Sequence, residues 1–525
     1  MIRIHQIKLL LDEDKALLKQ KCAKKLKISS SDIIEYRIVR ESLDARKQPL
    51  CFSYTVDVKV KNEKRCFGLK DVISVKEYHY EMPQCGVQDE PGRIVVAGFG
   101  PAGIYAALLL AQMGYRPLVL EKGEEMTKRV EKVQRFWHEG ILDEQCNVQF
   151  GEGGAGTFSD GKLTSRSKDP RSHKVLEEFV RFGAESSILY EAYPHIGTDR
   201  LRAIVVNMRK EILRLGGEIR FSSPLSDIKT NQNRITHIKT NEEWIPCKAL
   251  LLAVGHSARD VFALFHRHQV ALAQKAFAVG VRIEHPQELI NRAQYKDLSN
   301  HPRLRAASYR LSYTTKKGRG VYSFCMCPGG SVVNSASEQG GLVVNGMSEY
   351  ARDKENANSA LLVQVNPEDV GSRIMDGIHF QQSLERKAFQ LGKGSYNAPI
   401  QRLGDFLKQQ PSTALGSVTP SILPGYTLCD LHTILPEFVS EALLEAFPHF
   451  DKQLPHFLYD DAIMVGVETR SSSPLRMIRD QEALISPTLH NLYPCGEGAG
   501  YAGGIVSAAI DGLRCAEKVI ERFKK

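Results

Sequence analysis

The chain has 525 residues, of which 42% are hydrophobic and 25% are charged, and its formal net charge is +9. This length predicts two or three domains, and the ordinary composition excludes a largely disordered or fibrous chain. No uncharged stretch is long enough for a spanning helix, and charges interrupt each short apolar run at the N-terminus, which excludes a signal peptide. We expect a soluble, cytoplasmic protein without membrane association, whose eleven cysteines are mostly reduced and buried.

Residues 1–85 predict a small basic α+β domain. Alternating apolar positions indicate strands over residues 2–10, 33–40 and 51–60, and a four-residue apolar spacing indicates a helix over residues 12–28.

Most of the net charge lies in this first domain. Residues 1–80 hold 18 Lys and Arg against 11 Asp and Glu. The densest run, from Lys19 to Lys27, would occupy the solvated face of the predicted helix, opposite an apolar stripe from Leu18 to Leu26. The alternative interpretation is a docking surface for nucleic acid or an acidic protein.

A dinucleotide-binding motif follows the linker of residues 81–92. Arg93–Ala97 has the short apolar run of a buried parallel strand, and the turn Gly98-x-Gly100-x-x-Gly103 leads directly into a helical pattern. The first glycine permits the tight turn, the second lets the backbone approach a pyrophosphate, and the third lets helix and strand pack closely. We expect a phosphate at the helix N-terminus, where free N–H groups and the helix dipole favour negative charge.

An acidic residue completes the motif. The predicted strand Pro117–Leu120 ends at Glu121, 23 residues after Gly98 and close to the ~20 expected for a carboxylate that binds an adenosine ribose. These elements predict a Rossmann-type α/β unit. They do not separate NAD from FAD.

Two later glycine-rich segments predict further ligand contacts. In residues 147–166, small residues alternate with Thr157 and Lys162, so that the backbone can crowd a planar or phosphorylated ligand. Near the C-terminus, a strand at 491–494 runs into a glycine-rich turn and a small-residue helix from about Ile505, which brings a second helix N-terminus to the ligand.

The residues also carry a family resemblance. VAGFGPAG with a strand ending in Glu121, LLLAVGH at 250–256 and YPCGEGAG at 493–500 are similar to the three FAD-contacting segments of two-domain flavoproteins. Through QFGEGGAGTFSDGKL, the 325–348 region and ETRSSSPLRMIRD at 468–480, nearly the whole chain resembles the bacterial family of FAD-utilising (NAD/FAD-dependent) dehydrogenases. The resemblance implies bound FAD and redox activity. Reduced nicotinamide, NAD(P)H, could bind transiently in the cap cleft as the electron donor, or the donor could be a protein or the substrate itself.

The expected cofactor-binding residues combine these motifs and this resemblance. They are Gly98, Gly100, Pro101, Ala102, Gly103, Glu121, Lys122, Gly153, Gly154, Thr157, Gly161, Lys162, Val254, Gly255, Gly496, Glu497, Gly503 and Gly504.

The expected fold class is α/β, with a discontinuous Rossmann-type FAD-binding domain of residues 92–265 and 485–525. Residues 266–484 would form an inserted α+β substrate or cap domain, in addition to the small N-terminal α+β domain. A second G-x-G-x-x-G after a strand is missing, which argues against a separate NAD(P)H domain.

Candidate catalytic residues are few. Lys162 could polarise the flavin or bind an anionic substrate, or it could lie free on the surface. Arg470 and Arg476 could clamp a substrate carboxylate, or form structural ion pairs. His256 is a candidate acid or base without a visible partner.

Cys325 and Cys327 form the one close cysteine pair. They have neither the two-residue spacer of a redox motif nor a second Cys/His pair at metal-site spacing, so we expect a structural role and no metal.

The favoured function is an FAD-dependent oxidoreductase, a dehydrogenase or reductase that transfers hydride or electrons between flavin and a small-molecule substrate. A flavin monooxygenase would share the fold. A third class is an FAD-dependent RNA- or protein-modifying factor that docks through the basic N-terminal domain.

Overall fold

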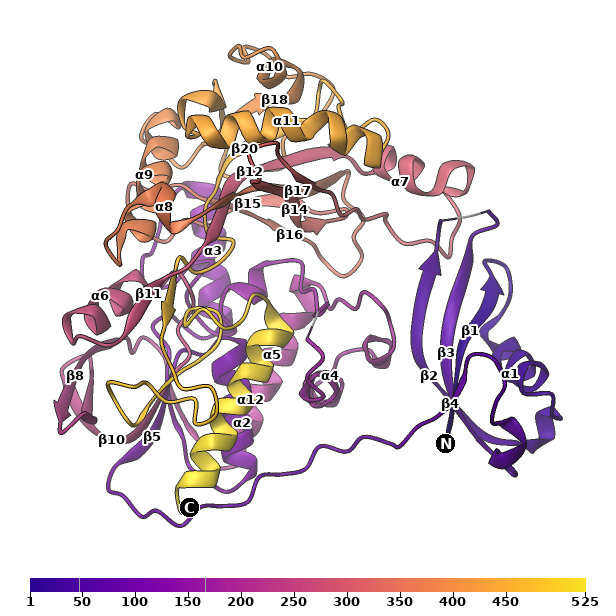
Figure 1. Cartoon of the computed structure of the whole chain (residues 1–525). Helices are drawn as coiled ribbons and strands as arrows, with labels where there is room; N and C mark the ends of the chain where they lie inside the picture. The colour runs from indigo at the N-terminus through magenta and orange to yellow at the C-terminus, as the bar shows by residue number, and fades with distance from the viewer. Residues whose placement is uncertain (47, 166) are drawn as a thin grey trace.

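The computed structural model describes residues 1–46, 48–165 and 167–525. Within these residues, the strands form three main sheets and two smaller pairs, and helices cover the sheets (Figure 1). The mixed α/β architecture includes a parallel sheet of Rossmann type, as the glycine motif predicted. No helix in the described ranges is both long and apolar enough to cross a bilayer.

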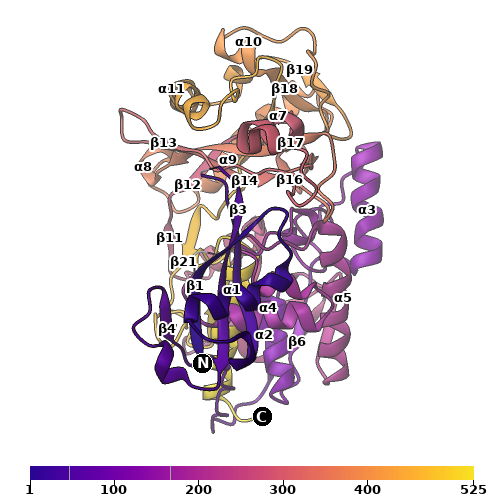
Figure 2. The same ribbon diagram turned by 90° about the vertical axis from the view of Figure 1, so that its right-hand side faces the viewer.

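The N-terminal sheet is a small unit beside the rest of the chain (Figures 1 and 2). Its antiparallel strands lie in the order β2 (Ile33–Asp44), β3 (Cys51–Val60), β1 (Ile2–Leu10) and β4 (Val72–Ser74). The helix α1 (Leu18–Leu26) packs its apolar stripe against them. The predicted helix began at residue 12, but α1 begins later because Asp14 caps a separate 3-10 turn through the Ala16 N–H.

The lysines of α1 are bonded partly within their own unit. Lys21 Nζ donates to the Lys8 carbonyl at 2.9 Å and contacts Glu13, and Lys25 Nζ donates to Asp71 at 3.0 Å. Lys24 is exposed. Lys21 and Lys25 thus contribute contacts within the N-terminal unit.

The central sheet contains five parallel strands. Their order is β7 (Glu218–Arg220), β6 (Leu118–Leu120), β5 (Arg93–Ala97), β10 (Glu243–Leu252) and β22 (Leu492–Pro494). The first half of β10 pairs instead with β9 (Arg234–Thr240), which in turn pairs with β8 (Leu225–Asn231). Because β22 comes from the end of the chain, the sheet is assembled from segments distant in sequence.

Both faces of the central sheet are buried, which explains the continuous apolar run of β5. Ile94 and Val96 pack in a core with four helices, whereas Val95 and Ala97 face a second core with β8 and β9. The four helices, grouped below the upper sheet in Figure 1, are α2 (Pro101–Gln112), α4 (Arg171–Arg181), α5 (Thr198–Arg214) and α12 (Ile505–Arg522).

The third sheet forms the upper part of the molecule in Figure 1. Its seven strands are β13 (Ser312–Thr314), β14 (Gly320–Cys327), β17 (Asn356–Val365), β12 (Phe277–Pro286), β20 (Ile463–Glu468), β18 (Ala398–Arg402) and β19 (Tyr426–Leu428), in spatial order. A single large core packs this sheet against α7 (Gln287–Tyr295), α9 (Asp376–Leu391) and α11 (Glu437–Gln453). The chain passes from the central sheet to the upper sheet through β11 (Leu272–Gln274) and returns through β21 (Leu475–Met477). These two short strands pair with each other.

The remaining elements connect these layers. They are α3 (Met126–Glu139), α6 (Arg259–Arg267), α8 (Pro367–Val370), α10 (Leu403–Leu407), β15 (Ser331–Asn334) and β16 (Val344–Met347). The linker after β4 passes the C-terminal end of α12, where the Gly86 N–H donates to the Ile520 carbonyl at 2.8 Å (Figure 1). The N-terminal unit also contacts the central unit through β2, whose Glu41 N–H donates to the Tyr190 carbonyl at 2.7 Å.

Candidate functional site

A cavity of about 350 Å³ lies at the carboxyl ends of β5, β6 and β10, where the central sheet meets the upper one. Ligands of open parallel sheets bind at this edge because the loops that follow the strands converge there. The N-terminal residues of two helices, α2 and α12, also line the cavity. Their free N–H groups and dipoles make this wall suitable for phosphate.

The first glycine turn has little room within the protein. Gly98 has a φ of +101°, and a Cβ there would lie 2.6 Å from the Ala253 carbonyl oxygen. A Cβ on Gly103 would lie 1.9 Å from the Gly98 oxygen, so this third glycine permits α2 to pack on β5. Gly100 is less crowded: its nearest atom would be Gly154 Cα at 3.7 Å. The outer glycines therefore shape the turn, and the middle one faces the ligand space.

Glu121 lies at the end of β6 with its carboxylate fixed by three backbone N–H groups. Those of Phe99, Gly123 and Gly151 donate to it at 2.8, 2.9 and 2.8 Å. Because a carboxylate offers about four acceptor sites, capacity for a ribose hydroxyl remains. The side chain is buried in the protein and borders the cavity.

Three glycines leave open space where a dinucleotide would need it. In the described part of the chain, no atom comes within 4 Å of a Cβ built on Gly255, Gly503 or Gly504. All three line the cavity, two of them immediately before α12. The protein's own packing does not require glycine there, and the residues thus fit a closely bound ligand.

Arg129 of α3 organises the first part of the glycine-rich loop, residues 147–157. Its fully buried guanidinium donates to the carbonyls of Asn147, Val148, Gly151, Glu152 and Gly154 and to the Thr157 hydroxyl, at 2.6–3.2 Å. Burial lowers the pKa of Arg129 to about 10, which leaves it charged at neutral pH. Arg129 could not be identified from the sequence, because five of its six partners are backbone carbonyl groups. Every residue carries such a group, so these contacts produce no sequence motif.

The cavity gathers most of the expected cofactor-binding residues. Those in its wall are Gly98, Gly100, Pro101, Ala102, Glu121, Lys122, Gly154, Lys162, Val254, Gly255, Glu497, Gly503 and Gly504. Gly103, Gly153, Thr157, Gly161 and Gly496 lie behind the wall. Thr157, for example, is fully buried and bonded to Arg129, and Gly161 packs against the Gly197 backbone. These five position the loops that face the ligand.

The far end of the cavity is polar and is built by the glycine-rich loop, the upper sheet and β16. Its residues are Asp160, Lys162, Cys325, Asn345 and Glu468. The Lys162 ammonium lies 3.5 Å from Asp160 Oδ2, and Asp160 also accepts from Arg352 at 2.6 Å. Asp160 Oδ1 is buried and has no hydrogen-bond partner among the described residues.

Glu468 is the most perturbed carboxyl of this end. Burial raises its pKa to about 7, although the neighbouring Arg282 guanidinium, at 2.8 Å, favours the charged form. A carboxyl with this pKa populates both protonation states near neutral pH, as an acid–base group must.

Comparison with known proteins identifies the cofactor. An uncharacterized protein of Clostridium beijerinckii is 50% identical over 528 residues, which cover 99% of each chain. A family described as "FAD-dependent protein, C-terminal domain-like" matches residues 276–471, and a domain of unknown function matches residues 1–59. The chain belongs to the family of the Clostridium beijerinckii protein. FAD is its cofactor.

Solved structures of flavoproteins are more distant. A halogenase PltM mutant in complex with FAD is 10% identical with a TM-score of 0.40, covering 82% of this chain and 69% of that one. A glycine oxidase from Bacillus cereus is 12% identical with a TM-score of 0.30, covering 82% of this chain and 95% of that one.

Arg470 borders the FAD cavity, but its guanidinium is engaged by protein. It bonds both carboxylate oxygens of Glu385, at 2.9 and 2.7 Å, and the Ser337 hydroxyl at 2.5 Å. Arg259 binds the same carboxylate from the other side, at 2.8 and 2.9 Å. The expectation that Arg470 clamps substrate is therefore corrected in favour of its structural alternative, because Glu385 takes up its bidentate face.

His256 also borders the cavity, next to an acidic partner that the sequence did not reveal. Its Nδ1 lies 3.3 Å from Glu497 Oε1. Its Nε2 is buried without a hydrogen-bond partner among the described residues. The pair joins the segments 250–256 and 493–500, and the two residues are 241 positions apart in sequence.

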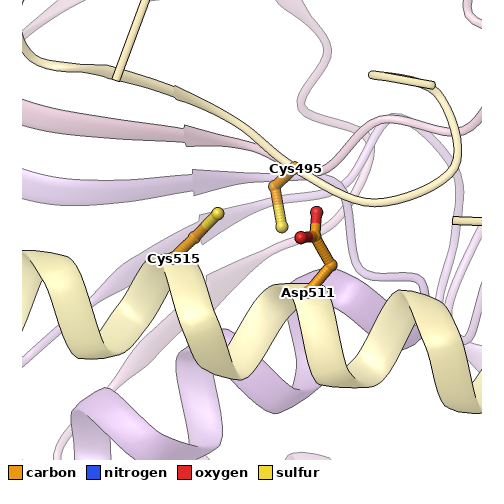
Figure 3. Close-up of side chains that lie close together, drawn as sticks. All are labelled: Cys495, Asp511 and Cys515. Carbon is orange, nitrogen blue, oxygen red and sulfur yellow. The ribbon is translucent and has the colours of Figure 1, made fainter. Parts of the chain in front are cut away.

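Cys495, Asp511 and Cys515 form a separate cluster behind the third segment (Figure 3). Both Asp511 oxygens accept from Arg479, at 2.6 and 2.9 Å, and one also accepts the Gly496 N–H at 2.8 Å. Asp511 thus binds a buried guanidinium and fixes the Gly496 turn. Arg479 Nη1 also lies 3.5 Å from Cys515 Sγ, so that its charge opposes the binding of a metal cation beside Asp511 and Cys515.

Proposed function

We propose that the protein is an FAD-dependent dehydrogenase or reductase that transfers hydride or electrons between flavin and a small-molecule substrate. The observation that carries this proposal is the continuity of one cavity from the phosphate-binding glycine turns to a polar end with an acid–base carboxyl. When bound, FAD would supply the hydride or electron chemistry.

The chain's own residues would orient the substrate and move a proton. Glu468 is the group to exchange a proton with substrate, because burial sets its pKa to about 7. Arg282 keeps the carboxyl in place through its 2.8 Å ion pair. Lys162 adds positive charge to the same end, suited to an anionic group of the substrate or of the reduced flavin.

The experiment begins with the purified full-length protein. We expect a yellow protein that releases FAD on denaturation, identified by chromatography. Anaerobic mixing with NADH, NADPH and a panel of small hydroxy, amino and unsaturated acids should then bleach the flavin with at least one compound. Absence of FAD after reconstitution would overturn the proposal, and oxygen-dependent formation of a hydroxylated product would replace it with a monooxygenase.

A matched pair of variants tests the assigned group. Glu468→Gln should retain FAD and lose substrate-dependent bleaching. Glu482→Gln, which changes an exposed carboxyl away from the cavity, should behave as the wild type.

A further inference from the structure

Cys325 and Cys327 lie on β14 at a break in strand pairing. Phe324 pairs with Ala360 of β17, and the next pair joins Cys327 to Asn358, so that β14 carries one extra residue. Cys325 has a φ of +43°, which is rare for a residue with a side chain. Such bulges re-aim side chains, and strained backbone of this kind concentrates at functional sites.

The bulge separates the two cysteines by environment. Cys325 is partly exposed and lines the cavity beside Phe324, whereas Cys327 is fully buried beneath it. The Cys327 thiol donates to the Cys325 carbonyl at 3.2 Å. One thiol thus belongs to the cavity wall, and the second is hydrogen-bonded to the backbone of the first. The structural role expected from their spacing does not account for Cys325 in the cavity wall.

Arg282 of β12 holds this bulge. Its fully buried guanidinium donates to the Cys325 carbonyl at 2.5 Å and lies 3.9 Å from Cys327 Sγ. It also binds Glu468 at 2.8 Å and Asn345 at 3.1 Å, both in the cavity wall. A Cβ on Gly346 would come within 2.5 Å of it, so that the neighbouring strand is also shaped around this side chain.

The charges around the pair favour a thiolate at one position. A hydrogen bond from Cys327 and the positive charges of Lys162 and Arg282 lower the pKa of Cys325 to about 6, against the opposing effects of burial and Asp160. Burial raises the pKa of Cys327 well above that of an ordinary thiol. Low-pKa thiolates of this kind are the reactive members of dithiol sites.

We propose that Cys325 and Cys327 are a redox-active dithiol of the cavity, which exchanges two electrons with the flavin and passes them to or from a thiol or disulfide substrate. This inference rests on the proposed function. In the oxidising direction, the Cys325 thiolate and the Cys327 thiol form one S–S bond, and oxidised FAD takes up the Cys327 proton together with two electrons to give the anionic reduced flavin. Glu468 lines the same cavity and binds Arg282, which also lies beside Cys327, so it is placed to relay this proton.

Two readouts test the pair. Anaerobic titration of the holoprotein with dithionite should consume four electrons per FAD in the wild type, and two in Cys327→Ser and in Cys325→Ser. Cys429→Ser, which removes a thiol outside the cavity, should keep the value of four. Mass spectrometry of the tryptic peptide 320–352, which holds both cysteines, should show an internal disulfide in oxidised dithiothreitol and two thiols in reduced dithiothreitol.

The outcomes separate this inference from the proposed function. FAD-loaded wild type that takes up two electrons would overturn the dithiol and leave the oxidoreductase assignment intact. Protein that takes up no FAD would overturn the oxidoreductase assignment, and with it this inference. A 320–352 peptide that stays reduced in both buffers would also overturn the pair. If Cys327→Ser fails to fold, Cys325→Ser, at the partly exposed position, gives the same comparison.

Discussion

Arg282 Nη1 lies 2.8 Å from Glu468 Oε2, and both side chains are buried at the polar end of the cavity. The ion pair does not fully offset the burial of the carboxyl, since the pKa of Glu468 is still raised to about 7. The upper sheet therefore supplies the proposed proton-exchanging group to a cavity whose other walls contain the expected cofactor-binding residues.

Glu468→Gln should lower kcat for substrate oxidation by about 10²–10⁴-fold, the usual contribution of an acid–base group. In this direction the ionised carboxyl accepts the proton, so that the wild-type rate should rise as pH increases through about 7. The variant should lack this ionisation in its profile. Steady-state rates from pH 5 to 9 check the prediction, and an unchanged limb near pH 7 in the variant would assign the proton transfer to another group.

Arg129→Lys should remove FAD binding and destabilise the protein by roughly 3–5 kcal/mol, because several buried carbonyls lose their only guanidinium donor. Lysine keeps the charge but cannot reach six acceptors. Urea unfolding and FAD content after purification measure the two effects. Arg135→Lys on the exposed side of the same helix is the control, where only an exposed i,i+4 pair changes. Full FAD occupancy in Arg129→Lys would contradict the role assigned to this residue.

The sequence predicted the central unit well where the signal is local. The apolar run of β5, the glycine turn and α2 follow one another within twenty residues, and β5 has the bounds Arg93–Ala97 that its apolar run predicted. The place of Arg282 and Cys325 in the cavity could not be predicted this way, because these residues meet only through the pairing of β12, β17 and β14. For Cys325, the informative feature is a bulge, which residue spacing does not encode. Glu121 was expected, but the three N–H groups that fix it come from loops distant from each other in the chain.

Two glycine substitutions should separate packing from ligand contact. Gly103→Ala places a methyl group 1.9 Å from the Gly98 oxygen, so that α2 must shift from β5, with a loss of about 1–3 kcal/mol in stability and of FAD binding. Gly255→Ala meets no atom of the described residues within 4 Å, so it should fold normally and weaken FAD binding alone. Thermal unfolding of the apoproteins and FAD titration distinguish them. Equal FAD affinity in Gly255→Ala and wild type would place the cofactor elsewhere in the cavity.

Glu385→Gln should destabilise the protein by about 3–5 kcal/mol at pH 7, because it removes the fully buried carboxylate between the guanidiniums of Arg259 and Arg470 and leaves them to share the less buried Glu338. The two arginines hold the pKa of Glu385 far below its usual range, against the opposing effect of burial. A depressed carboxyl pKa contributes stability that is complete above the unfolded value of about 4.3 and is lost as pH falls below it. The difference in the free energy of unfolding between wild type and variant should thus be constant from pH 6 to 8 and shrink below pH 4.

Urea unfolding at each pH measures this difference, with Glu482→Gln as the exposed control. If Glu385→Gln instead leaves the free energy of unfolding unchanged and alters only the KM for substrate, the structural role of this ion pair would be wrong. Arg470 would then be assigned to substrate binding, which its position in the cavity wall permits.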